Sequence, residues 1–437
     1  MNPKARRRCT RLGPPSTMFA KRCYDPIVLA RKAAPSRSFS VRLATARHRN
    51  VLFSLCVALM SAAGLVLPAA AEQSAPTQSM PVQTGTDLSP WDRQKNAIAK
   101  QAEVWFENYK FRDGETIPRL RIHYATLGDP HRGVDGSIDN AVLVLHWTGA
   151  DGLALLSPTY MKALFDPGRP LDAHRYYLIF PDSVGHGQSS KPSDRLKANF
   201  PSYGYRDIVD LQHKLVTETL GINHLHALLG MSMGGMNAWQ WAEAYPDVID
   251  GVMPVVSLPI KVSGRNMLWR RMVINDIRSD PEWKGGNYAE PPTGWLRGYE
   301  ILRMMIDGVP HLQAIVPDGQ AADRLIEDAR KQAEPVDAND ILYSLTSSAD
   351  YDPEPGLASI TTKVFALNFD DDEFNPEMLH VLERLIPQVA HGRFIVQPGS
   401  ETSFGHLTMA HPELWAQHVG EFMRWLGDAP PRLDQTR

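Results

Sequence analysis

The residues Gly230-Met231-Ser232-Met233-Gly234 place a serine between two glycines in a G-x-S-x-G pattern. An apolar run, His224–Leu229, leads into this pentapeptide, and a helical pattern from Met233 to Tyr245 follows it. This context predicts a sharp strand-to-helix turn, which needs small flanking residues and raises the serine hydroxyl above the end of the strand. The alternative is a tight turn whose serine only caps the helix. We interpret Ser232 as a nucleophile.

A serine hydroxyl is a poor nucleophile at neutral pH, so it needs a base that takes its proton and a carboxylate that orients this base. His406 follows the last apolar run, Arg393–Val396, and we interpret it as the base. His411 is the alternative, although it is better placed to begin the final helix beside Pro412. The sequence therefore predicts a base on the loop after the last strand.

The carboxylate is expected among three consecutive aspartates that follow the apolar run Lys363–Leu367, namely Asp370, Asp371 and Asp372. In parallel sheets, functional groups gather where the strands reach their carboxyl ends. An acidic loop is also often no more than a solvated surface, so the residues alone predict a group of candidates and not one acid.

An acyl-transfer site also needs two hydrogen-bond donors for the developing oxyanion. One is expected to be the backbone N–H of Met233, directly after the serine. The other is expected on the loop His146-Trp147-Thr148-Gly149, which follows the apolar strand Ala141–Leu145. We favour Thr148, with Trp147 as the alternative. Removal of one such donor typically lowers the rate about 100- to 1000-fold.

Apolar runs of strand length alternate with helical patterns on both sides of a long segment without clear strands. This alternation predicts an α/β fold with a mostly parallel central sheet flanked by helices. The core is expected over 91–258 and 352–426, and the segment 259–351, rich in helix formers, is expected to form an inserted helical cap. Residues 72–90 are polar and predict a flexible lead-in, and 427–437 predict a loose tail.

The first 71 residues have the pattern of a secretory signal peptide. Residues 1–50 contain 13 Lys and Arg and one acid, and an apolar run, Val51–Leu67, then ends in Ala69-Ala70-Ala71. A basic region, a short apolar core and an A-x-A ending are the parts of such a signal. We expect cleavage near Ala71 and a periplasmic or secreted mature protein. An uncleaved membrane anchor is the alternative.

Cleavage would change the chemistry of the chain. All three cysteines (Cys9, Cys23 and Cys56) precede Ala71, so the mature protein would have no disulfide, thiol nucleophile or cysteine metal site. Its 33 basic and 48 acidic residues would give a net charge of −15. This charge argues against nucleic acid or an anionic membrane as a partner. We expect a small-molecule acyl substrate and no stable membrane association.

Other histidines and glycines give weaker signals. His186 follows a predicted strand, and a loop-structuring role is favoured over a pocket role. His224 and His226 alternate like a metal pair, but no third ligand is evident. No glycine-rich phosphate loop is present in the sequence. We therefore expect no cofactor and no metal.

At these residues the chain resembles the homoserine O-acetyltransferase-like branch of the α/β-hydrolase superfamily. The motifs that carry the resemblance are Ser232-Met233-Gly234-Gly235-Met236, Asp207-Ile208-Val209 with Gln212, Asp280–Tyr288, Asp337-Ala338-Asn339, Asp372–Pro376 and Gly405-His406. The first residue of the Asp372–Pro376 motif is the family's acid, so the resemblance selects Asp372. It implies an α/β-hydrolase fold and leaves a homodimer open.

Two features separate the chain from homoserine acetyltransferases. The loop Asp182–Pro192 has the pattern of a common hydrolase loop in place of the family's G-x-x-G-S-T-G-P. Acetyl-CoA and homoserine are also cytoplasmic, whereas this chain is expected to be exported. We favour an exported serine hydrolase acting on an ester or related acyl compound. The alternatives are an O-acyltransferase and a catalytically silent binding protein on the same fold.

Overall fold

The computed structural model describes residues 99–427. The predicted signal peptide, the lead-in and all of the predicted tail except Gly427 lie outside these residues. Within 99–427, no helix combines the length and the apolar character that crossing a membrane requires.

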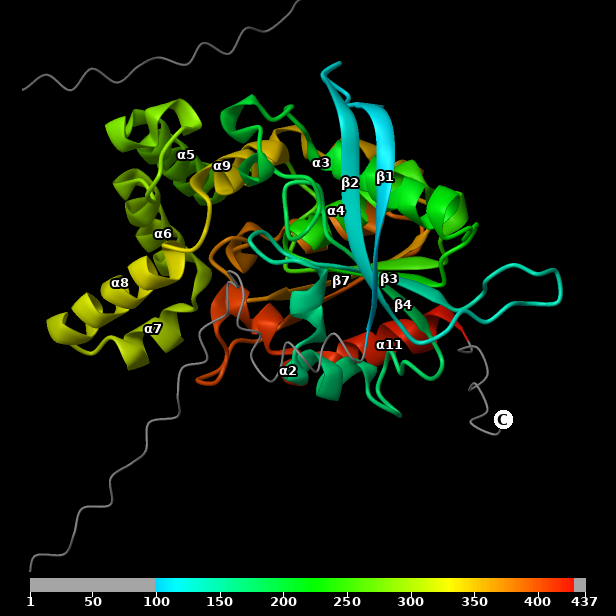
Figure 1. Ribbon diagram of the computed structural model, residues 1–437. Coiled ribbons are helices and arrows are strands. Elements are labelled where there is room, and N and C mark those ends of the chain that lie inside the picture. The colour runs from blue at the N-terminus through cyan, green and yellow to red at the C-terminus, as the bar shows by residue number, and fades with distance from the viewer. Residues whose placement is uncertain (1–98, 428–437) are drawn as a thin grey trace, which may run out of the picture. The chain divides into compact units, whose positions relative to one another are not determined.

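Eight strands form one sheet in the order β1-β2-β4-β3-β5-β6-β7-β8 (Figure 1). β2 pairs antiparallel with both β1 and β4, and the remaining neighbours pair in parallel. The predicted mostly parallel sheet is therefore confirmed. The strands are β1 (Lys100–Lys110), β2 (Thr116–Leu127), β3 (Ala141–Leu145), β4 (Tyr177–Pro181), β5 (Ala227–Met231), β6 (Gly251–Val255), β7 (Lys363–Phe369) and β8 (Gly392–Gln397).

Helices cover both faces of this sheet (Figure 1). Side chains alternate across a strand, so β3 sends Leu143 into one apolar cluster and Val144 into the other. The first cluster includes side chains of α3, α4 and α10, and the second includes side chains of α2 and α11. The bounds are α2 (Pro158–Tyr160), α3 (Tyr205–Lys214), α4 (Met233–Ala244), α10 (Val381–Leu385) and α11 (Ala416–Leu426). Burial of central strands on both faces explains their continuous apolar runs.

The chain between β6 and β7 contains helices and no strand among the described residues. Its apolar cluster is separate from the two clusters on the sheet and is built around Trp269, Trp295 and Leu342. We call this segment the cap. Its helices are α5 (Gly264–Ser279), α6 (Thr293–Ile306), α7 (Val309–Ile315), α8 (Gly319–Ala333) and α9 (Ala338–Thr346).

The structure differs from the predicted elements at several places. The long strand β1 was not predicted; most of its side chains are exposed, so it lacks the apolar run of a core strand. The helical pattern of Pro376–Leu385 does not form one continuous helix, because it is interrupted at His380, whose φ of 47° is left-handed. The final helix begins at Ala416 and not at His411, because a separate 3₁₀ turn, Pro412–Leu414, precedes it.

Candidate active site

Ser232 lies on a sharp turn between β5 and α4, near the middle of the sheet. Its φ of 53° and ψ of −110° are unusual for a residue with a side chain. Such a conformation costs on the order of 1–3 kcal/mol and persists where the surrounding structure enforces it. The Ser232 N–H donates to Val255 O at 2.9 Å, and the Met236 N–H donates to Ser232 O at 2.8 Å. These bonds fix the turn that exposes the hydroxyl.

The two glycines of the G-x-S-x-G pattern are required by close backbone contacts. A Cβ atom on Gly230 would lie 2.1 Å from Gly234 O, and one on Gly234 would lie 2.5 Å from Leu145 O. Both distances are well below van der Waals contact, and backbone atoms cannot move aside cheaply. Both glycines of the motif are therefore needed for the close packing of α4 against β3 and β5.

The structure brings Ser232, His406 and Asp372 together from three distant parts of the chain. His406 Nε2 lies 2.8 Å from Ser232 Oγ, and His406 Nδ1 lies 2.8 Å from Asp372 Oδ2. The imidazole is 2% exposed and the carboxylate residue is 1% exposed. The donor and acceptor distances have the geometry of a nucleophile, a base and an orienting acid.

Asp372 is held by the short segment that follows it. The N–H groups of Phe374 and Asn375 donate to its Oδ1, at 2.8 and 3.2 Å, and Asn375 Nδ2 donates to its Oδ2 at 2.8 Å. The same Nδ2 donates to Val256 O at 2.9 Å, which ties the segment to the end of β6. The buried carboxylate is thus both satisfied and fixed in orientation.

The other two aspartates have different partners. Asp371 Oδ2 accepts hydrogen bonds from Ser403 Oγ at 2.6 Å and from the Gly405 N–H at 3.1 Å. Asp370 is exposed, and its Oδ1 accepts from the Gly399 N–H. Both side chains therefore connect the loop after β7 to the loop that carries His406, and neither contacts the imidazole.

His411, the alternative base, does not contact Ser232. Its ring stacks on Phe404 with a centroid distance of 4.1 Å, and its Nδ1 lies 3.3 Å from Glu413 Oε1. Phe404 also packs edge-on against His311 of α7, at 4.8 Å. His411 therefore belongs to an aromatic group beside the His406 loop.

Of the two predicted oxyanion donors, Thr148 lines the pocket and Met233 directly follows Ser232 in the chain. Met233 is the first residue of α4, where backbone N–H groups have no partner within the helix. Thr148 and Trp147 both line the pocket beside Ser232. Their loop is held by His146, whose Nδ1 donates to Trp147 O at 2.9 Å while its Nε2 accepts from the Ser183 N–H at 3.0 Å. Burial lowers the pKa of His146, in agreement with an Nε2 that accepts a hydrogen bond.

The remaining predicted histidines lie elsewhere. The ring of His186 lies 3.0 Å from Ser344 Oγ of α9, and burial lowers its pKa to about 3. It therefore connects its loop to the cap as a neutral side chain. His224 and His226 both contact Asp250, at 2.7 and 2.9 Å. The alternating histidines are therefore explained by their shared hydrogen bonding to the Asp250 carboxylate.

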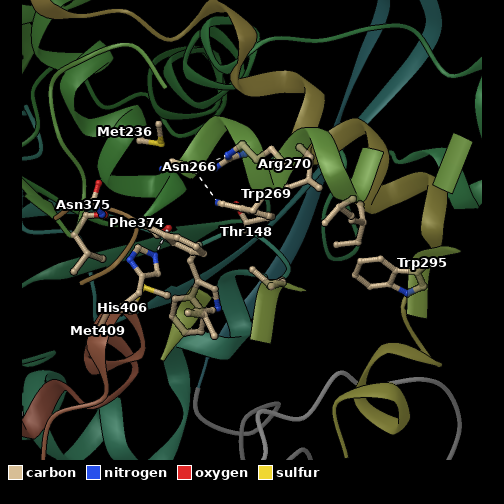
Figure 2. A pocket seen from close by; sticks show the side chains of 18 residues that line it. Thr148, Met236, Asn266, Trp269, Arg270, Trp295, Phe374, Asn375, His406 and Met409 are labelled. Atoms are coloured by element: carbon tan, nitrogen blue, oxygen red, sulfur yellow. Dashed lines mark hydrogen bonds between the residues drawn. The ribbon is translucent and has the colours of Figure 1, made fainter. Parts of the chain in front are cut away.

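Most side chains that line the pocket beside Ser232 are apolar, and the cap supplies the larger part of these apolar side chains (Figure 2). Trp269 of α5 stacks on Phe374 at 5.1 Å, and Phe374 packs against the His406 ring at 4.7 Å. Arg270 and Asn266 are polar members of the wall on α5. Sequence reasoning did not place Trp269, Phe374, Arg270 or Asn266 in the site. The helical spacing of Trp269 and Val273 nevertheless indicates a buried face. The full wall comprises Trp147, Thr148, Ser232, Met236, Val256, Asn266, Trp269, Arg270, Val273, Trp295, Leu302, Ile306, Ile341, Leu345, Phe374, Asn375, His406 and Met409.

Comparisons with known proteins identify the family of the chain. A family model described as the alpha/beta hydrolase fold matches residues 167–400. A probable acyltransferase from Methanothermobacter thermautotrophicus is 27% identical over 288 residues, which are 64% of this chain and 86% of that protein. A homoserine O-acetyltransferase from Haloarcula marismortui is 30% identical over 315 residues, which are 60% of this chain and 74% of that protein.

Two solved structures are similar to the described fold. Homoserine O-acetyltransferase from Bacillus anthracis has a TM-score of 0.66 at 22% identity, covering 77% of this chain and 99% of that one. An acetylester hydrolase from Corynebacterium glutamicum has a TM-score of 0.64 at 18% identity, covering 75% and 95%. The chain belongs to the α/β-hydrolase fold family, in the branch that contains the homoserine O-acetyltransferases. The family resemblance seen in the sequence is thereby confirmed.

Proposed function

We propose that the protein is an exported serine hydrolase that cleaves a small ester through an acyl-enzyme. The observation that carries this proposal is the pair of 2.8 Å contacts that joins Ser232, His406 and Asp372 below an apolar pocket. An intact set of nucleophile, base and acid also argues against a catalytically silent binding protein.

In the first half-reaction, Ser232 Oγ attacks the ester carbonyl carbon while His406 Nε2 takes the hydroxyl proton. Asp372 accepts the Nδ1–H of the ring, and thereby orients the imidazole and stabilises the imidazolium. The N–H groups of Met233 and Thr148 are assigned to the oxyanion. Collapse of the tetrahedral intermediate breaks the bond to the alcohol, which leaves with the proton from His406.

In the second half-reaction, His406 takes a proton from water and the resulting hydroxide attacks the acyl-enzyme carbonyl. The bond to Ser232 Oγ then breaks, and the proton on His406 returns to the serine. The products are a carboxylic acid and the free enzyme, so hydrolysis consumes one water. An acyltransferase would use the same residues with an acceptor alcohol in the place of water.

Two arguments favour hydrolysis over acyl transfer. The proposed export would remove the protein from cytoplasmic acetyl-CoA, and the Asp182–Pro192 loop has the pattern of hydrolases. The acyltransferase alternative is favoured by the relatives, because homoserine O-acetyltransferases and a probable acyltransferase are among them.

A panel of p-nitrophenyl esters of different acyl length, with and without acceptor alcohols, tests the proposal. We expect acid release without an acceptor, and Ser232→Ala is expected to abolish turnover and fluorophosphonate labelling while its thermal unfolding stays close to wild type. Turnover that requires an acceptor alcohol would identify an acyltransferase. Undiminished hydrolysis by Ser232→Ala would contradict the assigned nucleophile.

A further inference from the structure

Arg270 is a buried cation in the pocket wall without a carboxylate partner. It is 6% exposed and lines the same pocket as Ser232. Its Nε donates to Asn266 Oδ1 at 2.9 Å, and its Nη1 donates to Ser348 Oγ at 3.3 Å. Both acceptors are neutral, and no ion pair of Arg270 occurs within residues 99–427. Arg303 of the same cap, in contrast, pairs with Asp307 at 2.8 Å.

An unpaired guanidinium in an apolar wall is expensive, because removal of a charge from water must be compensated by an opposite charge or by hydrogen bonds. Arginine cannot escape this cost by losing its proton. The guanidinium lies 5.0 Å from the Trp269 ring, which attracts a cation but leaves its charge uncompensated. Its hydrogen-bond neighbours are Asn266, Ser348 and the buried Tyr205 hydroxyl, and these three partners do not use all five N–H donors. The pocket therefore retains both positive charge and free donors.

The guanidinium is also fixed in place. Asn266 Oδ1 accepts a second hydrogen bond from Trp269 Nε1 at 3.2 Å, and Ser348 Oγ donates to Leu345 O at 3.0 Å. Its two acceptors are therefore themselves held by the cap. Figure 2 shows Arg270 and Asn266 together on one side of the pocket, with His406 and Phe374 opposite them. Such preorganisation lowers the cost of binding a ligand.

We propose that Arg270 is a substrate-binding residue that selects esters carrying a carboxylate. This inference rests on the proposed function and names its substrate class. A planar carboxylate matches the guanidinium fork and would neutralise the buried charge. Arg270 is the one lysine or arginine among the residues that line the pocket. A second anion-binding residue of that kind is therefore not available in this wall.

Two pairs of esters, each matched in shape, test the proposal. For a carboxylate on the acyl side, p-nitrophenyl hydrogen glutarate is compared with p-nitrophenyl 5-methylhexanoate. For a carboxylate on the alcohol side, 4-acetoxybenzoate is compared with 4-acetoxybenzamide, with each rate divided by the uncatalysed rate. In one of the pairs we expect the wild-type kcat/KM to favour the charged ester by about 10- to 100-fold, which is the worth of hydrogen bonds to a charged group.

Arg270→Gln is expected to reduce that ratio to about one. Arg271→Gln is the matched control, because Arg271 is the next residue of α5 but is exposed, and it is expected to keep the wild-type ratio. Equal kcat/KM within both pairs, or an unchanged preference in Arg270→Gln, would overturn the proposal. Hydrolysis of the neutral esters with fluorophosphonate labelling of Ser232 would in that case leave the hydrolase function standing.

If Arg270→Gln does not fold, inhibition of the wild-type protein gives the answer. Glutarate and benzoate are then compared with glutaramide and benzamide as competitors against p-nitrophenyl acetate. We expect at least one carboxylate to inhibit competitively about tenfold or more better than its amide. Equal inhibition by acid and amide in both comparisons would overturn the proposal.

Discussion

Three consecutive aspartates follow β7, and their side chains do three different things. Asp372 accepts the His406 ring N–H, Asp371 holds Ser403 and the Gly405 N–H, and Asp370 holds the Gly399 N–H. Asp371 and Asp370 contact the chain between β8 and His406, whereas only Asp372 hydrogen-bonds to the base itself. Identical residue types thus acquire different roles from their hydrogen-bond partners.

We expect Asp372→Asn to lower kcat for ester hydrolysis roughly 10,000-fold, since the amide cannot hold the imidazole in the tautomer that accepts the serine proton. Asp370→Asn is the matched control, because this exposed residue lies two positions earlier in the same loop, and it is expected to stay within about threefold of wild type. Steady-state kinetics on one p-nitrophenyl ester measure both. Similar losses in the two variants would contradict the assignment of Asp372.

At the scale of elements, side chains of the cap pack against the residues that hold the catalytic base in place. Trp269 of α5 stacks on Phe374, which packs against the imidazole of His406. A second connection runs from α9 to the core, where Asp340 accepts hydrogen bonds from the N–H and the Oγ of Ser193, at 2.8 and 2.7 Å. The pocket wall and the catalytic loops are therefore packed as one unit.

The connection through Asp340 is expected to make stability depend on pH. Burial raises its pKa from 3.8 to about 7, and nearby Asp337 adds to the rise. Because the folded state then holds the proton more tightly than the unfolded chain, stability falls as pH rises, until the folded carboxyl has ionised near pH 7.

We expect Asp340→Asn to remove this dependence, since the amide has no proton to lose. Between pH 5 and pH 8, its free energy of unfolding should rise relative to wild type by roughly 2–3 kcal/mol, because one pKa unit corresponds to about 1.4 kcal/mol. Urea denaturation at a series of pH values measures this difference. Asp323→Asn, on the exposed side of α8, is the control, and parallel profiles for wild type and Asp340→Asn would refute the expectation.

At the scale of the whole molecule, the charges are unevenly distributed along the chain. Residues 1–50 contain 13 basic residues and one acid, whereas the chain after Ala71 has a net charge of −15. A basic segment followed by an apolar run favours export. An acidic mature protein would be repelled by an anionic membrane.

We propose that expression of the full chain in a Gram-negative host yields periplasmic protein that begins at Glu72. Intact-mass measurement and N-terminal sequencing of the periplasmic fraction test this. Leu59→Arg, which interrupts the apolar run Val51–Leu67, is expected to keep the protein in the cytoplasm at full length. A full-length wild-type protein in the membrane fraction would instead identify an uncleaved anchor.

The sequence by itself determined the features that depend on short stretches of chain. The turn at Ser232 was predicted because a strand, two glycines and a helix specify that backbone locally. The mostly parallel sheet was predicted because central strands are apolar on both faces, whereas β1 was not, because its exposed side chains become a strand only by pairing with β2.

The tertiary structure decided the features that depend on contacts between distant residues. Asp372 is the aspartate that hydrogen-bonds to His406 because Asn375 holds its loop against the end of β6. Ser232 and His406 are 174 residues apart in the chain. Arg270 gave no signal, because an arginine on a helix is ordinarily solvated. Its significance comes from burial without a counter-charge, and burial is set by how the cap packs against the sheet.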